Sequence, residues 1–220
     1  MNVNGNFGTL GIQSISNSAV LKKREKINSS LLFVCERSNW SDLATSFVRN
    51  VFSEVDVFFW NQGDIYPSLI DSWEGDYIIG FKADLIIKEN ILKKARKDVI
   101  NFHPAPPRYR GLGGYNYAVY NEDDSFGVTC HHMVKSVDYG KIIKVLDFPI
   151  LEYETASNLR VRSGAFCLIL LYEIVIKYIS TGNPLPISDR VWGSKLHRNS
   201  ELLEWMKAIR STNPQHKCLL

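Results

Sequence analysis

The chain has 220 residues, of which 45% are hydrophobic, 22% charged and 12% aromatic. This composition suits one well-filled globular domain with a small appendage and argues against extensive disorder. The formal net charge is only +3 and the basic residues are spread along the chain. We therefore expect anionic small ligands and no nucleic-acid partner. Charged residues interrupt every long apolar stretch, so no membrane partner is expected either.

The cysteines and the two chain ends predict a cytoplasmic protein. Cys35, Cys130, Cys167 and Cys218 show no paired spacing, which argues against a zinc ribbon and for reduced thiols. The first residues, MNVNGNFGTL, lack the basic start and apolar core of a signal peptide. The last four residues, KCLL, do not fit a prenylation box, and we expect them to form a frayed tail.

Taken in chain order, the first half of the sequence alternates between strand and helix patterns. Residues 1–30 precede the first buried strand and are expected to form an arm or a hairpin. Strands are predicted at 31–35, 55–60, 77–81 and 99–103, with helices at 40–52, 67–73 and 88–96. Alternation at this short spacing favours right-handed crossovers and a mainly parallel sheet.

The second half is predicted to contain two more strands and three helices. The helices are expected at 114–121, 155–179 and 202–209, and the strands at 126–133 and 141–148. The helix at 155–179 is so apolar that it must be mostly buried. Pro184 and Pro186 mark a change of organisation. We therefore predict a main domain at 31–181 and a C-terminal extension at 182–220, after the arm at 1–30.

Three polar side chains stand where this fold would place a ligand. Asn101 and His103 end a predicted strand, and Pro104 then forces the chain out of the sheet. Asp138 follows the next predicted strand, and ligands in such sheets bind beyond the carboxyl ends of the strands. An amide, an imidazole and a carboxylate can together stabilise an oxyanion and move the proton of an acyl transfer. Each residue alone is explained as well by a turn or a backbone cap, but the ordered set favours catalysis.

These motifs resemble the folate-dependent formyltransferases. That family combines an N-x-H strand end, a proline-rich loop ending in Arg-Gly or Pro-Gly, a G-V-T strand and a D-x-G followed by two apolar residues. Here the matching segments are 101–103, the loop PAPPRYRG, 127–129 and 138–143, and the resemblance covers about residues 31–151. It implies a Rossmann-like α/β fold with Asn101, His103 and Asp138 as catalytic trio. It also implies 10-formyltetrahydrofolate as co-substrate, and formyl transfer needs no metal.

The same resemblance places the folate donor. Family members hold the pterin mostly with main-chain groups after the third strand and before the catalytic aspartate. The corresponding residues here are Phe81, Lys82, Leu85, Ile86, Ile87, Met133 and Val137. Polar backbone edges suit a pterin because it presents donors and acceptors in one plane. For Leu85, Ile86 and Ile87 the alternative is plain core packing.

Differences from the family pattern indicate which acceptor molecule would receive the formyl group. The common Ser-Leu-Leu-Pro loop is replaced by residues 104–107, PAPP, and the remaining residues leave no room for the β-domain of tRNA-formylating members. The run GLGGYNYAVYN resembles members that formylate amino sugars carried on a nucleoside diphosphate. The resemblance assigns sugar contacts to Tyr109, Tyr115 and Asn116, and phosphate contacts to Arg108 or Arg110. The alternative is that the tyrosines pack on the sheet and the arginines are solvated.

The cluster Cys130-His131-His132 raises the question of a metal site. Neighbouring residues of a strand point to opposite faces, so His131 and His132 cannot both face one ion. We therefore expect no metal. His131 matches the histidine-bearing strand of the family and is the one expected to line the cleft.

The sequence thus predicts an N-formyltransferase acting on a nucleotide-linked deoxyamino sugar, with a dTDP-sugar favoured, for a bacterial surface polysaccharide such as the O-antigen of lipopolysaccharide. By resemblance alone it is expected to be a homodimer that uses the region from Gly182 onward. The alternatives are formylation of glycinamide ribonucleotide or methionyl-tRNA, hydrolysis of the formyl donor, and a non-catalytic homologue. The PAPP loop and the run GGYNYAVYN count against glycinamide ribonucleotide, and the intact trio counts against a non-catalytic role.

Overall fold

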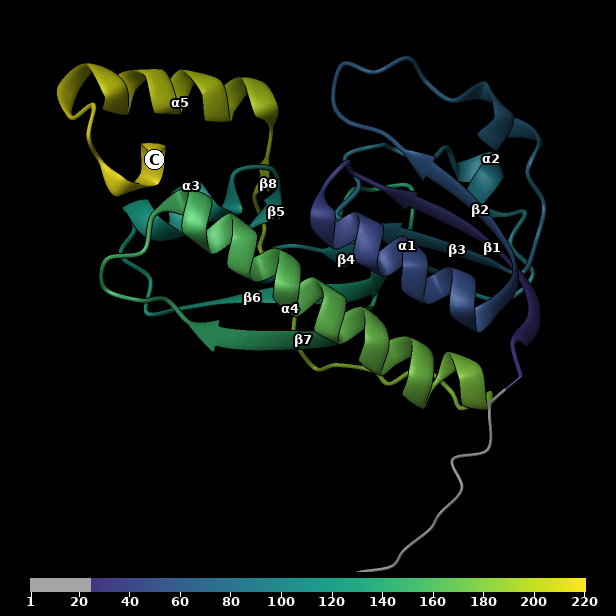
Figure 1. Cartoon of the computed structure of the whole chain (residues 1–220). Coiled ribbons are helices and arrows are strands. Elements are labelled where there is room, and N and C mark those ends of the chain that lie inside the picture. Colours follow the sequence, from purple (N-terminus) through teal and green to yellow (C-terminus); the bar gives the residue numbers. More distant parts are fainter. Residues whose placement is uncertain (1–24) are drawn as a thin grey trace, which may run out of the picture.

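A six-stranded sheet forms the centre of the molecule in the computed structural model, which describes residues 25–220. Most of the arm predicted at 1–30 therefore lies outside the described residues. The strands are β1 (Ile27–Cys35), β2 (Phe52–Phe59), β3 (Tyr77–Phe81), β4 (Val99–His103), β6 (Ser125–His132) and β7 (Ile142–Pro149). They lie in the order β2-β1-β3-β4-β6-β7. Figure 1 shows this sheet with its helices.

The first four strands are parallel and the last two are antiparallel to their neighbours. β2, β1, β3 and β4 pair in parallel, whereas β6 pairs antiparallel with both β4 and β7. The parallel strands are joined by crossovers, whereas residues 104–124 connect β4 to β6 and the short segment 133–141 connects β6 to β7. The predicted α/β class with a mainly parallel sheet is confirmed, and β3 and β4 have the bounds that the sequence predicted.

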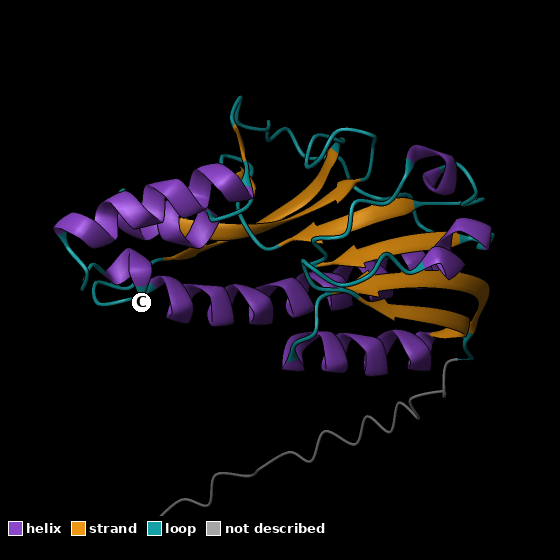
Figure 2. Ribbon diagram, turned by 90° about the horizontal axis from the view of Figure 1, so that it is seen from above, coloured by secondary structure: helices purple, strands orange, loops and turns teal. Residues whose placement is uncertain are grey.

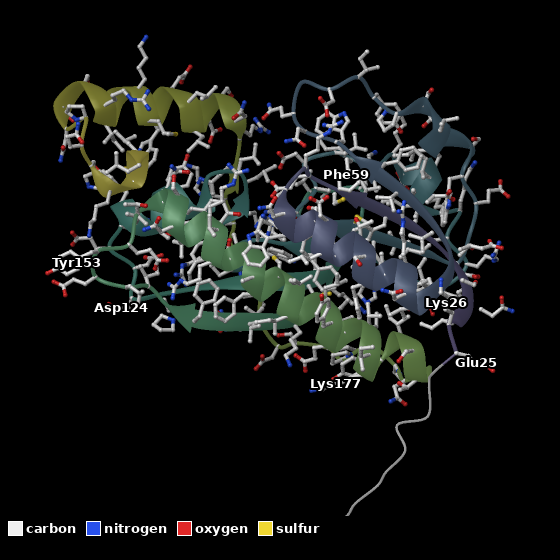
Figure 3. All side chains as sticks on the ribbon, in the orientation of Figure 1. Glu25, Lys26, Phe59, Asp124, Tyr153 and Lys177 are labelled. Carbon is white, nitrogen blue, oxygen red and sulfur yellow. The ribbon has the colours of Figure 1, made fainter. Side chains whose placement is uncertain are left out.

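Two long helices cover one face of the sheet (Figure 2). α1 (Asn39–Val51) begins at Ser38, whose side chain accepts a hydrogen bond from the Ser41 amide. α4 (Ala156–Lys177) buries one side along its length against the sheet. Figure 3 marks its course from the end near Asp124 and Tyr153 to Lys177. Within the described residues no helix is both long and apolar enough to cross a bilayer.

The opposite face of the sheet is covered by short elements. η1 (Ser68–Ser72) and α2 (Glu89–Leu92) pack Ile70 and Ile91 against this face. The helix predicted at 88–96 is therefore much shorter than expected. Residues 93–96 do not continue the helix. There the Arg96 amide donates to the Gly75 carbonyl (2.9 Å), and Ala95 forms a β-bridge with Gly75. Backbone pairing with the segment just before β3 is favoured over further helix, because this charged segment has little apolar surface to bury.

The C-terminal extension returns to the carboxyl ends of the strands. β8 (Leu196–His197) pairs with β5 (Arg110–Gly111), and α5 (Asn199–Thr212) follows it. η3 (Lys217–Leu219) then docks between α5 and α3 (Gly114–Tyr120), as Figure 1 shows.

The expectation of a frayed tail is wrong. The Asn116 side chain donates to the Cys218 carbonyl (2.7 Å), and the Ser157 amide donates to the main-chain oxygen of Leu220 (2.8 Å). The Cys218 side chain is fully buried. Burial of this side chain and satisfied backbone groups together hold the last residues in place.

Candidate active site

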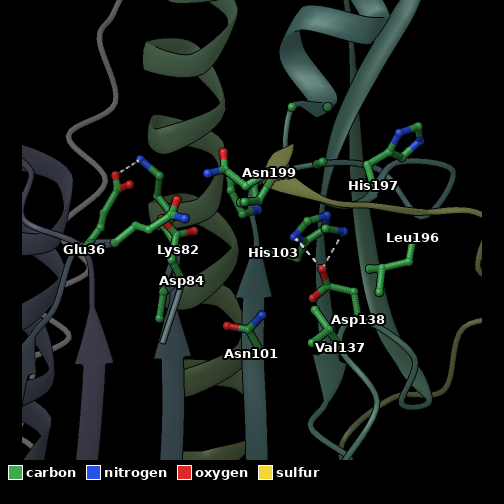
Figure 4. Close-up of a pocket in the computed structure, with 18 of the residues that line it drawn as sticks. Glu36, Lys82, Asp84, Asn101, His103, Val137, Asp138, Leu196, His197 and Asn199 are labelled. Carbon is green, nitrogen blue, oxygen red and sulfur yellow. Dashed lines mark hydrogen bonds and ion pairs between the residues drawn. The ribbon is translucent and has the colours of Figure 1, made fainter. Parts of the chain in front are cut away.

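A cavity of about 980 Å³ opens beyond the carboxyl ends of the parallel strands. Asn101, His103, His131 and Asp138 lie in its wall, three of them from β4 and β6 and the fourth from the loop before β7. The predicted trio is thus brought together although 37 residues separate Asn101 from Asp138. Figure 4 shows Asn101, His103 and Asp138 with Glu36, Lys82 and the two residues of β8 around them.

The backbone register of the sheet places Asn101. It stands opposite Gly80 of β3 on one side and His131 of β6 on the other. A Cβ at Gly80 would lie 2.5 Å from the Asn101 Oδ1, so glycine is needed there to leave room for the amide. The Asn101 Nδ2 lies 3.3 Å from the His131 Nε2. Asn101 and His103 share one face of β4 because they are two residues apart.

Asp138 is held in a demanding backbone conformation. Its φ is +44°, in the left-handed region that side chains other than glycine rarely adopt. Arg110 fixes this turn, because its Nε donates to the Asp138 carbonyl (2.8 Å) and its Nη2 to the Val137 carbonyl (3.1 Å). The Gly111 amide donates to the Asp138 Oδ2 (2.9 Å). The carboxylate is therefore oriented before any ligand binds.

Asp138 lies between two histidines. Its Oδ2 is 3.4 Å from the His103 Nδ1, and its Oδ1 is 3.3 Å from the His131 Nε2. Burial alone would raise the pKa of this carboxyl, because Asp138 is only 8% exposed. The neighbouring imidazoles and the Gly111 amide outweigh burial and hold the pKa of Asp138 well below its usual range. The site therefore keeps an ionised carboxylate in a nearly dry position.

Six of the seven residues predicted to hold the folate donor line the cavity. They are Lys82, Leu85, Ile86, Ile87, Met133 and Val137. Phe81 does not, because its side chain is fully buried between the rings of Phe33 and Phe102. Lys82 has a positive φ of 50°, and its Nζ donates to the Glu36 Oε1 (2.6 Å).

The residues predicted to contact the acceptor divide into two groups. Tyr115 and Asn116 line the cavity, whereas Arg108, Tyr109 and Arg110 do not.

Arg108 donates to the Asp123 Oδ2 (2.8 Å) and to the Ser125 carbonyl, and the Tyr109 hydroxyl also donates to Asp123 (2.7 Å). Arg110 donates to the main chain of the Asp138 turn. A phosphate contact by either arginine would require it to leave these partners.

One wall of the cavity was not found from the sequence. It comes from the C-terminal extension and consists of Leu196, His197, Arg198, Asn199, Leu202, Met206, Leu219 and Leu220. The sequence predicted a helix at 202–209, but a helix pattern does not tell which surface the helix covers. The extension also supplies Trp192, whose Nε1 donates to the Gly140 carbonyl (2.7 Å) beside the Asp138 turn.

Comparison with known proteins agrees with this geometry. The family described as formyl transferase matches residues 62–171, half of the chain. An N-formyltransferase from Helicobacter canadensis, crystallised with folinic acid and dTDP-3-aminofucose, has a similar fold, with a TM-score of 0.64 and 19% identity. The match covers 77% of this chain and 71% of that one.

Two curated relatives match in sequence. The GDP-perosamine N-formyltransferase of Brucella melitensis is 29% identical over 51% of this chain and 44% of its own length. The methionyl-tRNA formyltransferase of Mycoplasma capricolum is 33% identical over 53% of this chain and 36% of its own length. The matched part is thus less than half of either relative. With half of its residues matched and the fold shared, the chain belongs to the formyl transferase family.

Proposed function

We propose that this protein is a cytoplasmic N-formyltransferase that moves the formyl group of 10-formyltetrahydrofolate to the amine of a nucleotide-linked deoxyamino sugar. The observation that carries the proposal is that Asn101, His103 and Asp138 line one cavity together with the predicted donor residues and the wall from the C-terminal extension. Figure 4 shows Lys82 on one side of His103 and Asp138, and Leu196 and His197 of the C-terminal extension on the other. Two substrates can therefore meet over one set of polar groups.

The proposed reaction forms a bond between the acceptor nitrogen and the formyl carbon and breaks the bond from that carbon to N10 of the folate. One proton passes from the attacking amine to the leaving nitrogen. The ionised carboxylate of Asp138 accepts it, and the Asn101 amide donates to the oxyanion of the tetrahedral intermediate. His103 donates through Nε2 to the Tyr109 carbonyl (2.8 Å) and presents Nδ1 to Asp138. It is therefore placed to share the proton with Asp138.

The donor side is mostly apolar, with Leu85 and Ile87 nearly buried and Ile86 66% exposed at the cavity mouth. In this proposal these side chains contact the flat faces of the pterin. Main-chain groups of the same segment and of the loop 133–137 then meet its polar edge. Neither contact requires a metal.

The acceptor proposal rests on the run GLGGYNYAVYN and on the names of relatives. A similar structure holds dTDP-3-aminofucose, and a curated relative acts on GDP-perosamine. Tyr115 and Asn116 of that run line the acceptor side, together with Arg198 and Asn199 at the start of α5. We favour a dTDP-sugar that serves a surface polysaccharide such as O-antigen. The four free and buried thiols are consistent with the reducing cytoplasm where such sugars are made.

The test is to incubate the purified protein with 10-formyltetrahydrofolate and a panel of dTDP-, UDP- and GDP-linked amino sugars. Tetrahydrofolate release is followed by absorbance, and the gain of a formyl group on each sugar by mass spectrometry. Formylation of one sugar that is absent with Asp138→Asn supports the proposal. Donor loss without a formylated sugar would identify a hydrolase, and persistence of the donor with every sugar would refute the proposal.

Methionyl-tRNA is the second acceptor in the test, because methionyl-tRNA formyltransferases are among the sequence relatives. Formylation of charged tRNA with none of any sugar would replace the sugar proposal. We also propose a homodimer that uses the region from Gly182 onward. Light scattering at the assay concentration measures the mass directly, and a monomer mass would exclude the dimer.

A further inference from the structure

The diphosphate of the proposed acceptor needs partners other than Arg108 and Arg110. Both of these arginines, which the sequence suggested, donate to groups of the protein itself, to Asp123 and to the main chain of the Asp138 turn. A phosphate that leaves water requires cationic or N–H donors in their place. Within the described part of the chain, the lysine and arginine side chains that line the cavity are Lys82, Lys135, Arg160 and Arg198.

Two of these cations are poorly placed for an acceptor phosphate. The Lys82 Nζ donates to the Glu36 Oε1 (2.6 Å), and only 3% of the Lys82 side chain is exposed. Such a buried pair is costly to separate. Lys135 lies in the loop 133–137, which is predicted to hold the folate donor. Arg160 and Arg198 remain as candidates.

Arg160, near the start of α4, has hydrogen-bond donors that the protein does not need. Its contact with a carboxylate, from Nη2 to the Glu36 Oε2, is 3.4 Å long, whereas charge-assisted hydrogen bonds of this kind measure about 2.7–2.9 Å. Lys82 already neutralises Glu36. The Arg160 side chain is 61% exposed, and a guanidinium presents several N–H donors in a flat fork. An anion in the cavity can therefore engage Arg160 without leaving a buried carboxylate unpaired.

Arg198 brings a second guanidinium, from the C-terminal extension. It is the residue just before α5, and its side chain is exposed and makes no capping hydrogen bond to the helix. Figure 4 draws Asn199, the next residue, between the Glu36–Lys82 pair and His103. Arg198 thus adds to the cavity wall a charge that the helix itself does not use.

Arg160 is also close to the catalytic groups. Burial raises the pKa of the Asp84 carboxyl in the cavity wall, whereas Arg160 and His103 both lower it. Charges act on one another over about 10 Å at physiological salt, so Arg160 and His103 both lie within that reach of Asp84. One nucleotide sugar is long enough to touch both. Because Lys82 neutralises Glu36, Asp84 is the carboxylate that an anion beside Arg160 has to avoid.

We propose that Arg160 and Arg198 bind the diphosphate of the nucleotide-linked sugar, one guanidinium from α4 and the other from the C-terminal extension. The inference rests on the proposed function and adds a phosphate subsite to the same cavity. With the diphosphate held there, the sugar ring extends toward Asn101, His103 and Asp138, where its amine meets the formyl carbon. The ligand then links the main domain to the extension.

Calorimetric titration with dTDP, UDP and GDP tests this subsite without any formyl transfer. We expect Arg160→Gln to weaken the binding of the preferred nucleoside diphosphate about tenfold, and Arg198→Gln about threefold or more. The corresponding nucleoside, which has no phosphate, should bind equally to Arg160→Gln and to the unchanged protein. Arg160→Lys keeps the charge but not the flat fork, and should recover part of the loss. The thermal midpoint checks that each variant is folded.

Arg37 provides a matched control. Its side chain is 58% exposed, against 61% for Arg160, and it also pairs with one carboxylate, that of Asp64. Arg37 does not line the cavity. Arg37→Gln should therefore leave the affinity for every nucleoside diphosphate unchanged. Equal losses in Arg37→Gln and Arg160→Gln would mean that only general surface charge matters, and would overturn the inference.

Transfer assays separate this inference from the proposed function. If a sugar is formylated, Arg160→Gln should raise the KM of that sugar about tenfold, with kcat and the donor KM within about twofold. An affinity and a KM that Arg160→Gln leaves unchanged would overturn the inference while the proposed function stands. If no sugar is formylated, weaker binding of a nucleoside diphosphate by Arg160→Gln still supports the subsite. Failure of the unchanged protein to bind any of the three nucleoside diphosphates at millimolar concentration would overturn it.

Discussion

The two sides of the cavity are built in different ways. On the side of β3, β4 and β6, the sheet register itself places Asn101 between Gly80 and His131. On the other side, the C-terminal extension is attached by the short β5–β8 pair, by the hydrogen bond from Trp192 to the Gly140 carbonyl, and by contacts of its last residues with α3 and α4. The sheet register therefore positions the catalytic groups, whereas the surface proposed to select the acceptor comes from the C-terminal extension.

The substitution Asp138→Asn is the strongest test of the side of the cavity built by the sheet. The substitution keeps the size of the side chain but removes the proton acceptor, so we expect turnover to fall by about a thousandfold or more. Single-turnover kinetics with saturating donor and acceptor measure the loss. The thermal midpoint is the control, and normal turnover in a folded variant would remove Asp138 from the mechanism.

The low pKa of Asp138 also predicts how this variant depends on pH. Because the folded protein favours the ionised form, the carboxylate stabilises the fold above the pKa of an unfolded aspartate, near 4. This contribution is lost as the pH falls through the lower pKa of the folded state. Asp138→Asn should therefore be less stable than the unchanged protein at pH 7, and the difference should shrink below about pH 4. Urea unfolding at both pH values measures it.

His103→Ala should have the next largest effect. It removes one of the two imidazoles at Asp138 and the bond to the Tyr109 carbonyl. We expect kcat to fall by on the order of a hundredfold. Circular dichroism checks that the fold is intact, and wild-type turnover would exclude His103 from the reaction.

Trp192→Ala probes the link between the two sides. Its ring packs on His131 and its Nε1 bonds to the Gly140 carbonyl, so its loss should loosen the Asp138 turn and lower kcat about tenfold. Trp192→Phe keeps much of the packing and should recover most of that loss. An alanine variant with unchanged kcat would mean that the extension has no part in positioning the catalytic groups.

Two substitutions, one in each wall of the cavity, should each change the KM of a different substrate. Met206→Ala, in the wall from the extension, should raise the KM of the acceptor about fivefold and leave the donor KM unchanged. Ile87→Ala, in the donor wall, should raise the KM of the donor and leave the KM of the acceptor unchanged. Initial rates with each substrate varied in turn give both values. Equal effects of both variants on both substrates would contradict the division of the cavity.

The smallest effect is expected where the extension crosses the edge strand β7. The Arg190 Nη1 lies 2.8 Å from the Asp147 Oδ2, and both side chains are more than 40% exposed. Such solvated pairs contribute about 0.5 kcal/mol. Arg190→Ala should therefore leave the free energy of unfolding and the activity nearly unchanged. A large loss would show that the course of the extension depends on this pair.

The difference between the two sides of the cavity also explains which features the sequence could predict. The bounds of β3 and β4 and the assembly of Asn101, His103 and Asp138 followed from apolar periodicity, the prolines and the order of the motifs. These are local signals, and the parallel sheet converts them into positions in space. The wall from the extension could not be found in this way, because the partner of a helix face depends on contacts across the chain.

The partners of the two arginines could not be predicted for a related reason. Arg108 and Arg110 stand in a motif that suggested phosphate binding, but their partners in the structure are Asp123 and the carbonyls of Val137 and Asp138. A sequence shows that a guanidinium is present, not which acceptors lie near it in the fold. Likewise, nothing in KCLL signals that its backbone will be met by Asn116 and Ser157.

The docked tail has a practical consequence for anyone who prepares this protein. Because Leu219 and Leu220 form part of the cavity wall, any residues attached after Leu220 start beside the proposed acceptor side. An uncleaved affinity tag or fluorescent fusion at that end would crowd the proposed acceptor site and compete for the Ser157 amide. Enzyme purified with such a tag would then show a raised acceptor KM that belongs to the tag and not to the protein.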